Sequence, residues 1–140
     1  MPAADTDSEE SDETDGVTVR PAGPRDHLGV MRVLDGANLA VDAGVVEDRI
    51  DAGTVLVADD ANRIVGALLG VPRGGTGMHV EAVAVRRRRR ARGVGTRLVG
   101  AAVARWRPLT ADFDPGVKPF YDALGFDCER RGERYRGILG

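Results

Sequence analysis

Residues 78–98, MHVEAVAVRRRRRARGVGTRL, constrain the fold more than any other stretch of the chain. They begin with an apolar run that predicts a buried strand over residues 78–85. Strict alternation would place its side chains on two faces, with Val80, Ala82 and Ala84 on one and His79, Glu81, Val83 and Val85 on the other. An arginine-rich turn follows, and a helix of small residues then runs to about Arg105.

The junction between this turn and the helix predicts an anion-binding site. The first N–H groups of a helix have no partner within the helix, and the helix dipole places partial positive charge there. Gly93 and Gly95 carry no side chain that would keep an anion away from the backbone. Two common phosphate motifs are excluded. No Gly-Lys-Ser/Thr is present, and Leu98 stands where a dinucleotide fingerprint needs its third glycine.

Charge is distributed unevenly along the 140 residues. Residues 1–16 hold seven acidic residues and no basic one. Residues 17–140 therefore hold 15 of the 22 acidic residues and all 20 basic residues, which gives them a net charge of +5. The acidic segment lacks the apolar residues that would offset its ordering entropy, so we expect it to be disordered. Residues 17–140 have the size of one domain, and their basic character indicates an anionic partner.

The composition disfavours several other classes of protein. No run of 18 apolar residues is present and the N-terminus is acidic, so we expect neither a membrane span nor a signal peptide. The one cysteine, Cys128, forms no internal disulfide and fits a reducing cytoplasm. With two histidines and one cysteine in the chain, we expect no metal site.

The remaining elements follow a mixed α/β (α+β) order. Periodicity and turn residues predict a strand over 17–21, helices over 24–39 and 44–52, strands over 54–59, 63–71 and 78–85, a helix to about 105, a strand over 109–113, a helix over 117–124, and a hairpin of 126–131 with 134–139. The strand, helix and strand within 78–113 should form a parallel pair with a right-handed crossover. Strands four and five would then part where the arginine turn begins.

Two motifs in this order resemble a known family. Residues 90–95, Arg-Ala-Arg-Gly-Val-Gly, fit the pattern Arg/Gln-x-x-Gly-x-Gly/Ala, and residues 120–126, Phe-Tyr-Asp-Ala-Leu-Gly-Phe, fit Phe-Tyr-x-x-Leu-Gly-Phe. Both resemble signatures of the GNAT superfamily of acetyl-CoA-dependent N-acetyltransferases, over roughly residues 17–139. The resemblance implies the GNAT fold, a mixed and mostly antiparallel sheet with strands four and five splayed and helices on both faces.

The resemblance also implies an acetyl-CoA site. The cofactor diphosphate would bind backbone N–H groups of residues 91–96, and arginine side chains among residues 86–92 would add charge-assisted bonds, some of them to the 3′-phosphate of CoA. The implied cofactor-binding residues of this turn are Arg90, Ala91, Arg92, Gly93, Val94, Gly95 and Thr96. The pantetheine arm would pair with the backbone of Val83, Ala84 and Val85, and the N–H of Val83 would polarise the acetyl carbonyl. Asp114 stands where many relatives have an asparagine that contacts the cofactor, and it lacks the amide donor.

By the same resemblance, Tyr121 would protonate the CoA sulfur. A phenol with an ordinary pKa of about 10 keeps its proton near neutrality and can donate it to a thiolate. Two residues are candidates for the general base. His79 matches the position of a catalytic glutamate in the histone-acetylating branch of the family, and Glu81 is the other candidate, acting directly or through a water. Both residues could instead be structural.

The sequence therefore predicts an N-acetyltransferase that transfers acetyl to a primary amine by direct attack in a ternary complex. A CoA-binding sensor without turnover is a second hypothesis. A nucleic-acid-binding module built on Arg86–Arg92 is a third, and the chain holds few aromatic residues on which bases would stack. The acceptor amine, on a small molecule or a peptide, stays open, and so does a homodimer.

Overall fold

The computed structural model describes residues 16–140. The segment predicted to be disordered, residues 1–16, therefore lies outside the described residues except for Gly16. The strands are β1 (Val17–Pro21), β2 (Val55–Asp60), β3 (Arg63–Pro72), β4 (Met78–Val85), β5 (Leu109–Phe113), β6 (Asp127–Arg131) and β7 (Arg134–Leu139). The α-helices are α2 (His27–Gly36), α3 (Ala43–Asp51), α4 (Val94–Arg105) and α5 (Lys118–Ala123), with 3-10 turns at Pro24–Asp26, Arg87–Arg89 and Pro115–Val117.

The strands form one sheet in the order β1-β2-β3-β4-β5-β7-β6. Every neighbouring pair is antiparallel except β4 and β5, which are parallel. The helix α4 connects these two strands, since parallel neighbours need a crossover connection rather than a tight turn. The predicted mixed, mostly antiparallel sheet is confirmed.

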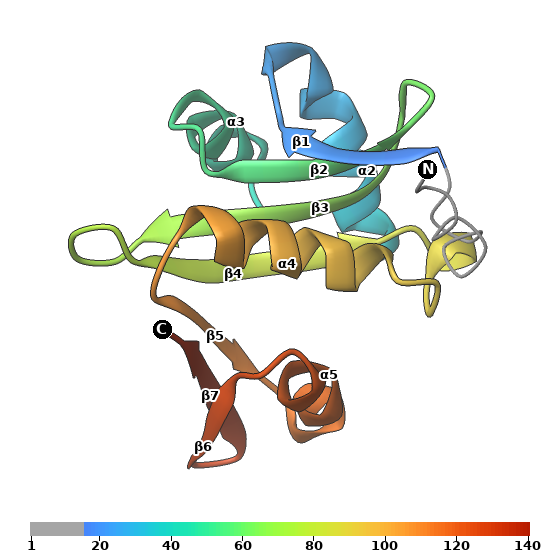
Figure 1. Cartoon of the computed structure of the whole chain (residues 1–140). Coiled ribbons are helices and arrows are strands. Elements are labelled where there is room, and N and C mark those ends of the chain that lie inside the picture. The colour runs from blue at the N-terminus through green and yellow to red at the C-terminus, as the bar shows by residue number, and fades with distance from the viewer. Residues whose placement is uncertain (1–15) are drawn as a thin grey trace, which may run out of the picture.

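Helices cover both faces of the sheet, as the sequence predicted (Figure 1). The helices α2 and α3 pack on one face through a buried cluster that includes Val30, Leu34 and Val46. The helices α4 and α5 lie on the other face, where Leu98 and Tyr121 belong to a second buried cluster. Strands such as β3 contribute to both clusters, because successive side chains of a strand point to opposite faces.

The helix α2 is shorter than predicted. The sequence predicted a helix from Pro24 to about Leu39, but α2 ends at Gly36. Asn38 adopts the left-handed conformation, with a φ of 60°. The N–H of Leu39 then donates to the carbonyl of Leu34 at 3.0 Å, which closes the helix. The residues that follow form the loop to α3.

The helix α4 packs closely on β3 at Gly66. A Cβ built on this glycine would lie 3.0 Å from side-chain carbons of both Val94 and Leu98. Those two residues are only 1% and 0% exposed, so their side chains have little room to move. The missing side chain at position 66 therefore sets how near the first turns of α4 lie to the sheet.

We expect Gly66→Ala to destabilise the fold by about 1–3 kcal/mol, because the added methyl group would overpack this contact. Gly100→Ala is the matched control, since Gly100 is exposed on the same helix and an added Cβ there meets nothing within 4 Å. That change should stabilise the helix by up to about 1 kcal/mol. Urea unfolding of both variants measures these values, and an unchanged stability of Gly66→Ala would contradict the packing argument.

Candidate functional site

The parallel pairing of β4 with β5 covers only a short part of either strand. Met78–Val80 pair with Leu109–Ala111, but β4 continues to Val85 and β5 to Phe113. Figure 1 shows β5 turning away from β4 and running with β7 and β6. The predicted splay of strands four and five is confirmed. Beyond Val80, β4 is paired only with β3 among the strands of residues 16–140.

A β-bulge in β4 lies at the point where the strands part. Leu69 of β3 pairs with Ala82, but the next residue of β3, Gly70, pairs with Val80. Glu81 is therefore an extra residue without a direct partner on β3, which is the definition of a bulge. The bulge rotates the rest of β4 relative to its beginning.

The bulge shows that the strict alternation predicted for β4 is wrong. Val80 lies on the side of α4 and α5, together with Val83 and Val85. Ala82 and Ala84 lie on the other side, under α2 and α3. The sequence predicted that Val80 lies on the same face as the two alanines. That prediction assumed a regular alternation along β4, which the extra residue Glu81 interrupts.

The turn after β4 contains two left-handed residues, Ala91 (φ 62°) and Gly93 (φ 88°). Gly93 is the N-cap of α4, and its carbonyl accepts a helical bond from the N–H of Arg97 at 3.0 Å. The α-helix leaves three N–H groups before this bond without a partner, those of Val94, Gly95 and Thr96. Within residues 16–140, neither a capping side chain nor a loop carbonyl accepts from them.

The start of α4 lies against the end of β4 and against α5. A Cβ built on Gly95 would lie 3.7 Å from the ring of Phe120 and 3.9 Å from Val85. The positive end of the helix dipole is thus close to the part of β4 that has lost its partner β5. This arrangement can bind an anion through backbone N–H groups and hold an extended group along the neighbouring strand.

Tyr121 on α5 lies in an aromatic cluster beside β5. Its ring stacks on Phe113, with centroids 4.3 Å apart, and meets Phe120 and Phe126 edge-on, each at 5.1 Å. Burial and, to a lesser extent, the nearby Cys128 thiol raise the pKa of Tyr121 to about 12. The phenol therefore keeps its proton throughout the neutral range and can act as a proton donor.

His79 is buried where β4 and β5 part. Its Nδ1 lies 2.6 Å from the hydroxyl oxygen of Thr110, and its Nε2 lies 3.7 Å from the carboxylate of Asp112. Burial, and then the charge of Arg73, lower the pKa of His79, so the ring is neutral at pH 7. The carboxylate favours the tautomer with the proton on Nε2, and Nδ1 then accepts from the Thr110 hydroxyl. Nδ1 is thus hydrogen-bonded, and Nε2 faces the Asp112 carboxylate at a distance too long for a direct hydrogen bond.

Glu81, the extra residue of the bulge, interacts with α3. Its Oε1 accepts from Nε of Arg49 at 3.0 Å, and its Oε2 accepts from Nη2 at 3.4 Å. One third of the Glu81 side chain (33%) is exposed. A carboxylate has about four lone-pair sites, so Arg49 does not exhaust its capacity to accept a proton or a water hydrogen.

A family model described as an acetyltransferase (GNAT) domain matches residues 51–128, which is more than half of the chain. The chain belongs to the GNAT acetyltransferase family. This assignment confirms the predicted GNAT fold and the predicted enzyme class, acetyl transfer. No match is found among curated proteins.

Solved structures with the same fold are distant in sequence. Ard1 from Thermoplasma volcanium is 18% identical, with a TM-score of 0.74 over 88% of this chain and 95% of that one. A GNAT family acetyltransferase from Brucella melitensis, in complex with acetyl-CoA, is 18% identical, with a TM-score of 0.69 over 89% and 87%. Naa50 from Arabidopsis thaliana, in complex with the bisubstrate analogue CoA-Ac-MVNAL, is 12% identical, with a TM-score of 0.71 over 88% and 97%.

One arginine of the GNAT turn makes internal contacts. Nε of Arg90 donates to the carbonyl of Val85 at 2.9 Å, and its Nη2 donates to the carbonyl of Gly36 at 3.4 Å. Arg90 thus ties the turn to β4 and to the end of α2. Arg92 and the neighbouring Ala91 are exposed. The sequence motif could not separate an arginine that supports the turn from one that faces solvent.

Asp114 lies on the loop between β5 and α5. Its carboxylate accepts from Nε of Arg134 at 3.0 Å, and 78% of its side chain is exposed. This ion pair joins the loop to β7. A contact between Asp114 and the cofactor stays a prediction, and the carboxylate would have to leave or share Arg134 to make it.

The residues that surround the two base candidates were not predicted from the sequence. Arg136 on β7 donates two hydrogen bonds to Asp112, at 2.8 and 3.0 Å, and thereby lowers the pKa of that carboxyl group. The alternation of β5 could have revealed part of this network, because Thr110 and Asp112 face away from the buried Leu109, Ala111 and Phe113. The partnership between Glu81 and α3 has no such signal.

Two general features complete the description of the GNAT domain. Among residues 16–140, no group of three or more histidine, cysteine, aspartate or glutamate side chains is arranged to hold a metal ion. No helix in this range is both long enough and apolar enough to cross a membrane.

We expect the free energy of unfolding to decrease as the pH falls below about 6.5, the ordinary pKa of histidine. Folding lowers the pKa of His79, so below that pH the unfolded chain binds a proton that the folded chain does not yet bind. The decrease ends once the folded His79 is protonated as well. His79→Gln should show a smaller decrease in urea unfolding between about pH 7 and 5.5.

His27→Gln is the control, because it removes the other histidine and should leave this pH dependence in place. Asp112 does not contribute to this pH dependence, because its lowered pKa keeps the carboxylate charged between about pH 7 and 5.5. The same pH dependence in His79→Gln and in the unchanged chain would contradict a buried neutral His79.

Proposed function

We propose that residues 17–140 transfer an acetyl group from acetyl-CoA to a primary amine by direct attack in a ternary complex. One observation carries the proposal. The pairing of β4 with β5 ends after Val80, beside a helix start whose first N–H groups have no capping or loop acceptor within residues 16–140. Membership of the GNAT family supports both halves of this site. We also propose a cytoplasmic location, in keeping with a cysteine that forms no disulfide, Cys128.

The start of α4 would hold the diphosphate of acetyl-CoA. The backbone N–H groups of Val94, Gly95 and Thr96 and the helix dipole fit an anion, and the left-handed Gly93 leads the chain into this turn. The exposed Arg92 would add a charge-assisted hydrogen bond. Residues Arg90 and Ala91 would contribute by shaping the turn.

The edge of β4 that faces away from β3 would hold the pantetheine arm. Val83, Ala84 and Val85 pair with β3 on one side only, so backbone groups that point to the other side can bind the amides of an extended ligand. The carbonyl of Val85 already accepts from Nε of Arg90 and is not among them. Acetyl-CoA, when bound, supplies the thioester that reacts. An N–H group from this edge, proposed to be that of Val83, would stabilise negative charge that develops on the acetyl oxygen.

Tyr121 is the proposed proton donor to the leaving sulfur. Its buried phenol, with a pKa near 12, is protonated at the pH of the reaction and lies in the cluster of α5 and β5 on the cofactor side of the sheet. The departing thiolate needs one proton, and the phenol, which is protonated at this pH, is the proposed source of that proton.

Glu81 is the proposed proton acceptor from the amine. Its carboxylate is partly exposed at the point where β4 leaves β5, and Arg49 fixes its position from α3. His79 is the alternative. Its two ring nitrogens face Thr110 and Asp112, so it would first have to give up one of these contacts. The geometry therefore favours Glu81 as the base and His79 as a residue that holds the β4–β5 junction.

Direct attack is proposed over a covalent acetyl-enzyme because of the protonation state of the cysteine. Cys128, the one cysteine of the chain, lies on β6 opposite Gly137 of β7. Burial, and then the side chain of Asp122, raise the pKa of its thiol, so little of the thiolate that would have to attack the acetyl group is present at neutral pH.

We expect acetyl-CoA to stabilise the full chain against unfolding, by about 2.7 kcal/mol at 100 times its Kd. Gly95→Val should remove most of this stabilisation, since the new side chain would enter the space between α4, Val85 and Phe120. Gly100→Val on the exposed side of the same helix is the matched control and should keep it. Thermal unfolding with and without millimolar acetyl-CoA measures the effect.

Failure of acetyl-CoA to stabilise the unchanged chain would overturn the proposed cofactor site. Stabilisation without acetylation of any amine in a broad panel would identify a CoA sensor instead of an enzyme. Tight nucleic-acid binding that acetyl-CoA does not displace would favour the nucleic-acid module.

We expect Tyr121→Phe to lower kcat by roughly 10²–10⁴-fold while the affinity for acetyl-CoA stays the same, because the change removes only the proton donor. Tyr135→Phe is the matched control, since Tyr135 also stacks on Phe113, with centroids 6.2 Å apart. In the same assay Glu81→Gln should also lower kcat, because the amide cannot accept the proton of the amine. Unchanged turnover in either variant would remove that residue from the mechanism.

A further inference from the structure

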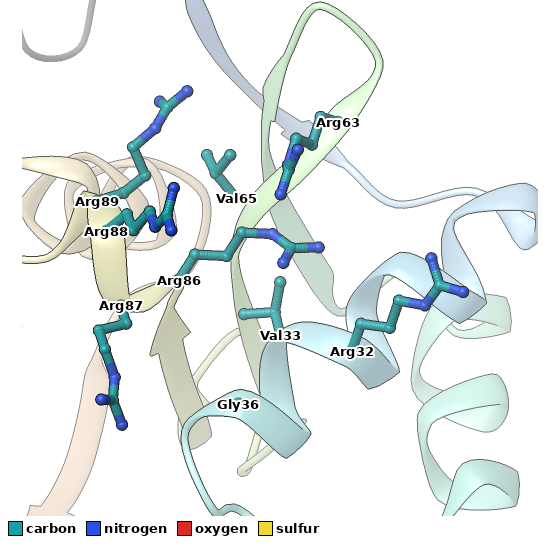
Figure 2. Close-up of a pocket in the computed structure, with 9 residues that line it drawn as sticks. All are labelled: Arg32, Val33, Gly36, Arg63, Val65, Arg86, Arg87, Arg88 and Arg89. Carbon is teal, nitrogen blue, oxygen red and sulfur yellow. The ribbon is translucent and has the colours of Figure 1, made fainter.

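An arginine cavity lies between α2, the start of β3 and the turn after β4. It has a volume of about 580 Å³ and nine lining residues, of which none is acidic and six are arginines, namely Arg32, Arg63, Arg86, Arg87, Arg88 and Arg89. Figure 2 shows these arginines arriving from three separate segments, with Arg63 and Arg86 directed toward one another. The backbone groups of β4 and α4 and the Arg92 side chain, which are proposed to hold acetyl-CoA, do not line this arginine cavity.

The positive charge in the arginine cavity is poorly balanced. Arg89 pairs with the carboxylate of Asp60, and Nε of Arg86 donates to the neutral carbonyl of Ile64 at 2.9 Å. Arg32 and Arg63 have no salt bridge within the described residues, and both disfavour the charged form of Arg86, whose pKa is lowered chiefly by burial. Guanidinium groups gathered in this way repel one another, and an anion between them would remove that repulsion.

The described chain begins beside this cavity. Val17, the first residue of β1, pairs with Asp60, and Asp60 in turn binds Arg89 of the arginine cavity. Nη1 of Arg97 donates to the carbonyl of Val17 at 2.7 Å, which fixes the start of β1 at this end of the sheet. Gly16, the first described residue, therefore lies next to Asp60 and close to the arginine cavity.

The residues that precede Gly16 in the sequence have the opposite charge. Positions 1–15 hold seven acids and no base, namely Asp5, Asp7, Glu9, Glu10, Asp12, Glu13 and Asp15. Fifteen residues can reach up to about 50 Å when extended. Because the acidic segment is linked to the domain, its effective concentration near the cavity is on the order of millimolar. A free anion of similar affinity would need a higher concentration to displace it.

We propose that the arginine cavity binds the chain's own acidic N-terminal segment, residues 5–15. Carboxylates of this segment pair with guanidinium groups such as those of Arg32 and Arg63, and they keep polyphosphates out of the cavity. The segment is thus an intramolecular competitor for anions at a site separate from the catalytic one. The proposal does not depend on acetyl transfer.

The test is a double-mutant cycle in the full chain. One variant neutralises the seven acids, with Asp→Asn and Glu→Gln at each position, and a second carries Arg32→Gln and Arg63→Gln. The control variant carries Arg130→Gln and Arg131→Gln on β6. It removes the same number of positive charges, at a place far from the cavity. A version of the segment with its acids in shuffled order retains the charge and should behave as the unchanged chain.

At about 20 mM salt, neutralising the acids should lower the midpoint of thermal unfolding by about 4 °C in the unchanged and control backgrounds. In the Arg32→Gln/Arg63→Gln background the shift should be below about 1 °C, because the partners of the segment are already gone. The difference should disappear at about 1 M salt, where exposed charges are screened. The same shift in all three backgrounds would overturn the proposal.

Binding of inorganic tripolyphosphate gives a second readout that does not depend on stability. Its affinity should rise about tenfold when the seven acids are neutralised, and this rise should require Arg32 and Arg63. Equal affinity in the unchanged and neutralised chains would show that the arginine cavity is open to external anions and is not occupied by the segment. Tight binding of single-stranded nucleic acid to the unchanged chain would overturn the proposal in the same way.

Discussion

The early end of the pairing between β4 and β5 is the constraint on which the rest of the structure depends. Three residue pairs hold the two strands together, and the Glu81 bulge lies directly after them. A bulge increases the local twist of a strand and bends it, so β4 follows β3 while β5 turns away with β7. The same bend brings the end of β4 to the start of α4, where Gly95 lies near Val85.

Polar side chains hold this junction on the side opposite the core of α4. A buried histidine would destabilise the sheet if its nitrogens had no partners. His79 avoids this loss through the Thr110 hydroxyl and the nearby Asp112, and Arg136 in turn orients Asp112. The network joins β4, β5 and β7 at the point where their backbones begin to separate. It therefore makes a break in the sheet compatible with a stable fold.

The arginines of the turn after β4 carry several roles that one string of letters conceals. Arg90 donates to backbone carbonyls and shapes the turn, Arg89 pairs with Asp60, and Arg92 faces solvent. Guanidinium groups suit all three tasks, because each offers five donors in a fixed plane. Arg86, Arg87, Arg88 and Arg89 line a cavity together with Arg32 and Arg63. The basic run thus contributes to two proposed anion-binding sites, and the neighbours that each side chain meets decide to which site it belongs.

The sequence by itself determined the features that depend on residues near one another in the chain. The strand, the left-handed Gly93 and the helix start follow from local backbone preferences, and the element order with its two motifs fixed the GNAT fold. Tertiary structure alone decided which face each β4 residue occupies, because the bulge exists only relative to the register of β3. It also decided that Arg49 holds Glu81 and that Arg32 and Arg63 join the cavity. These partners lie on different elements, and their distance is set by packing across the sheet, which no local pattern encodes.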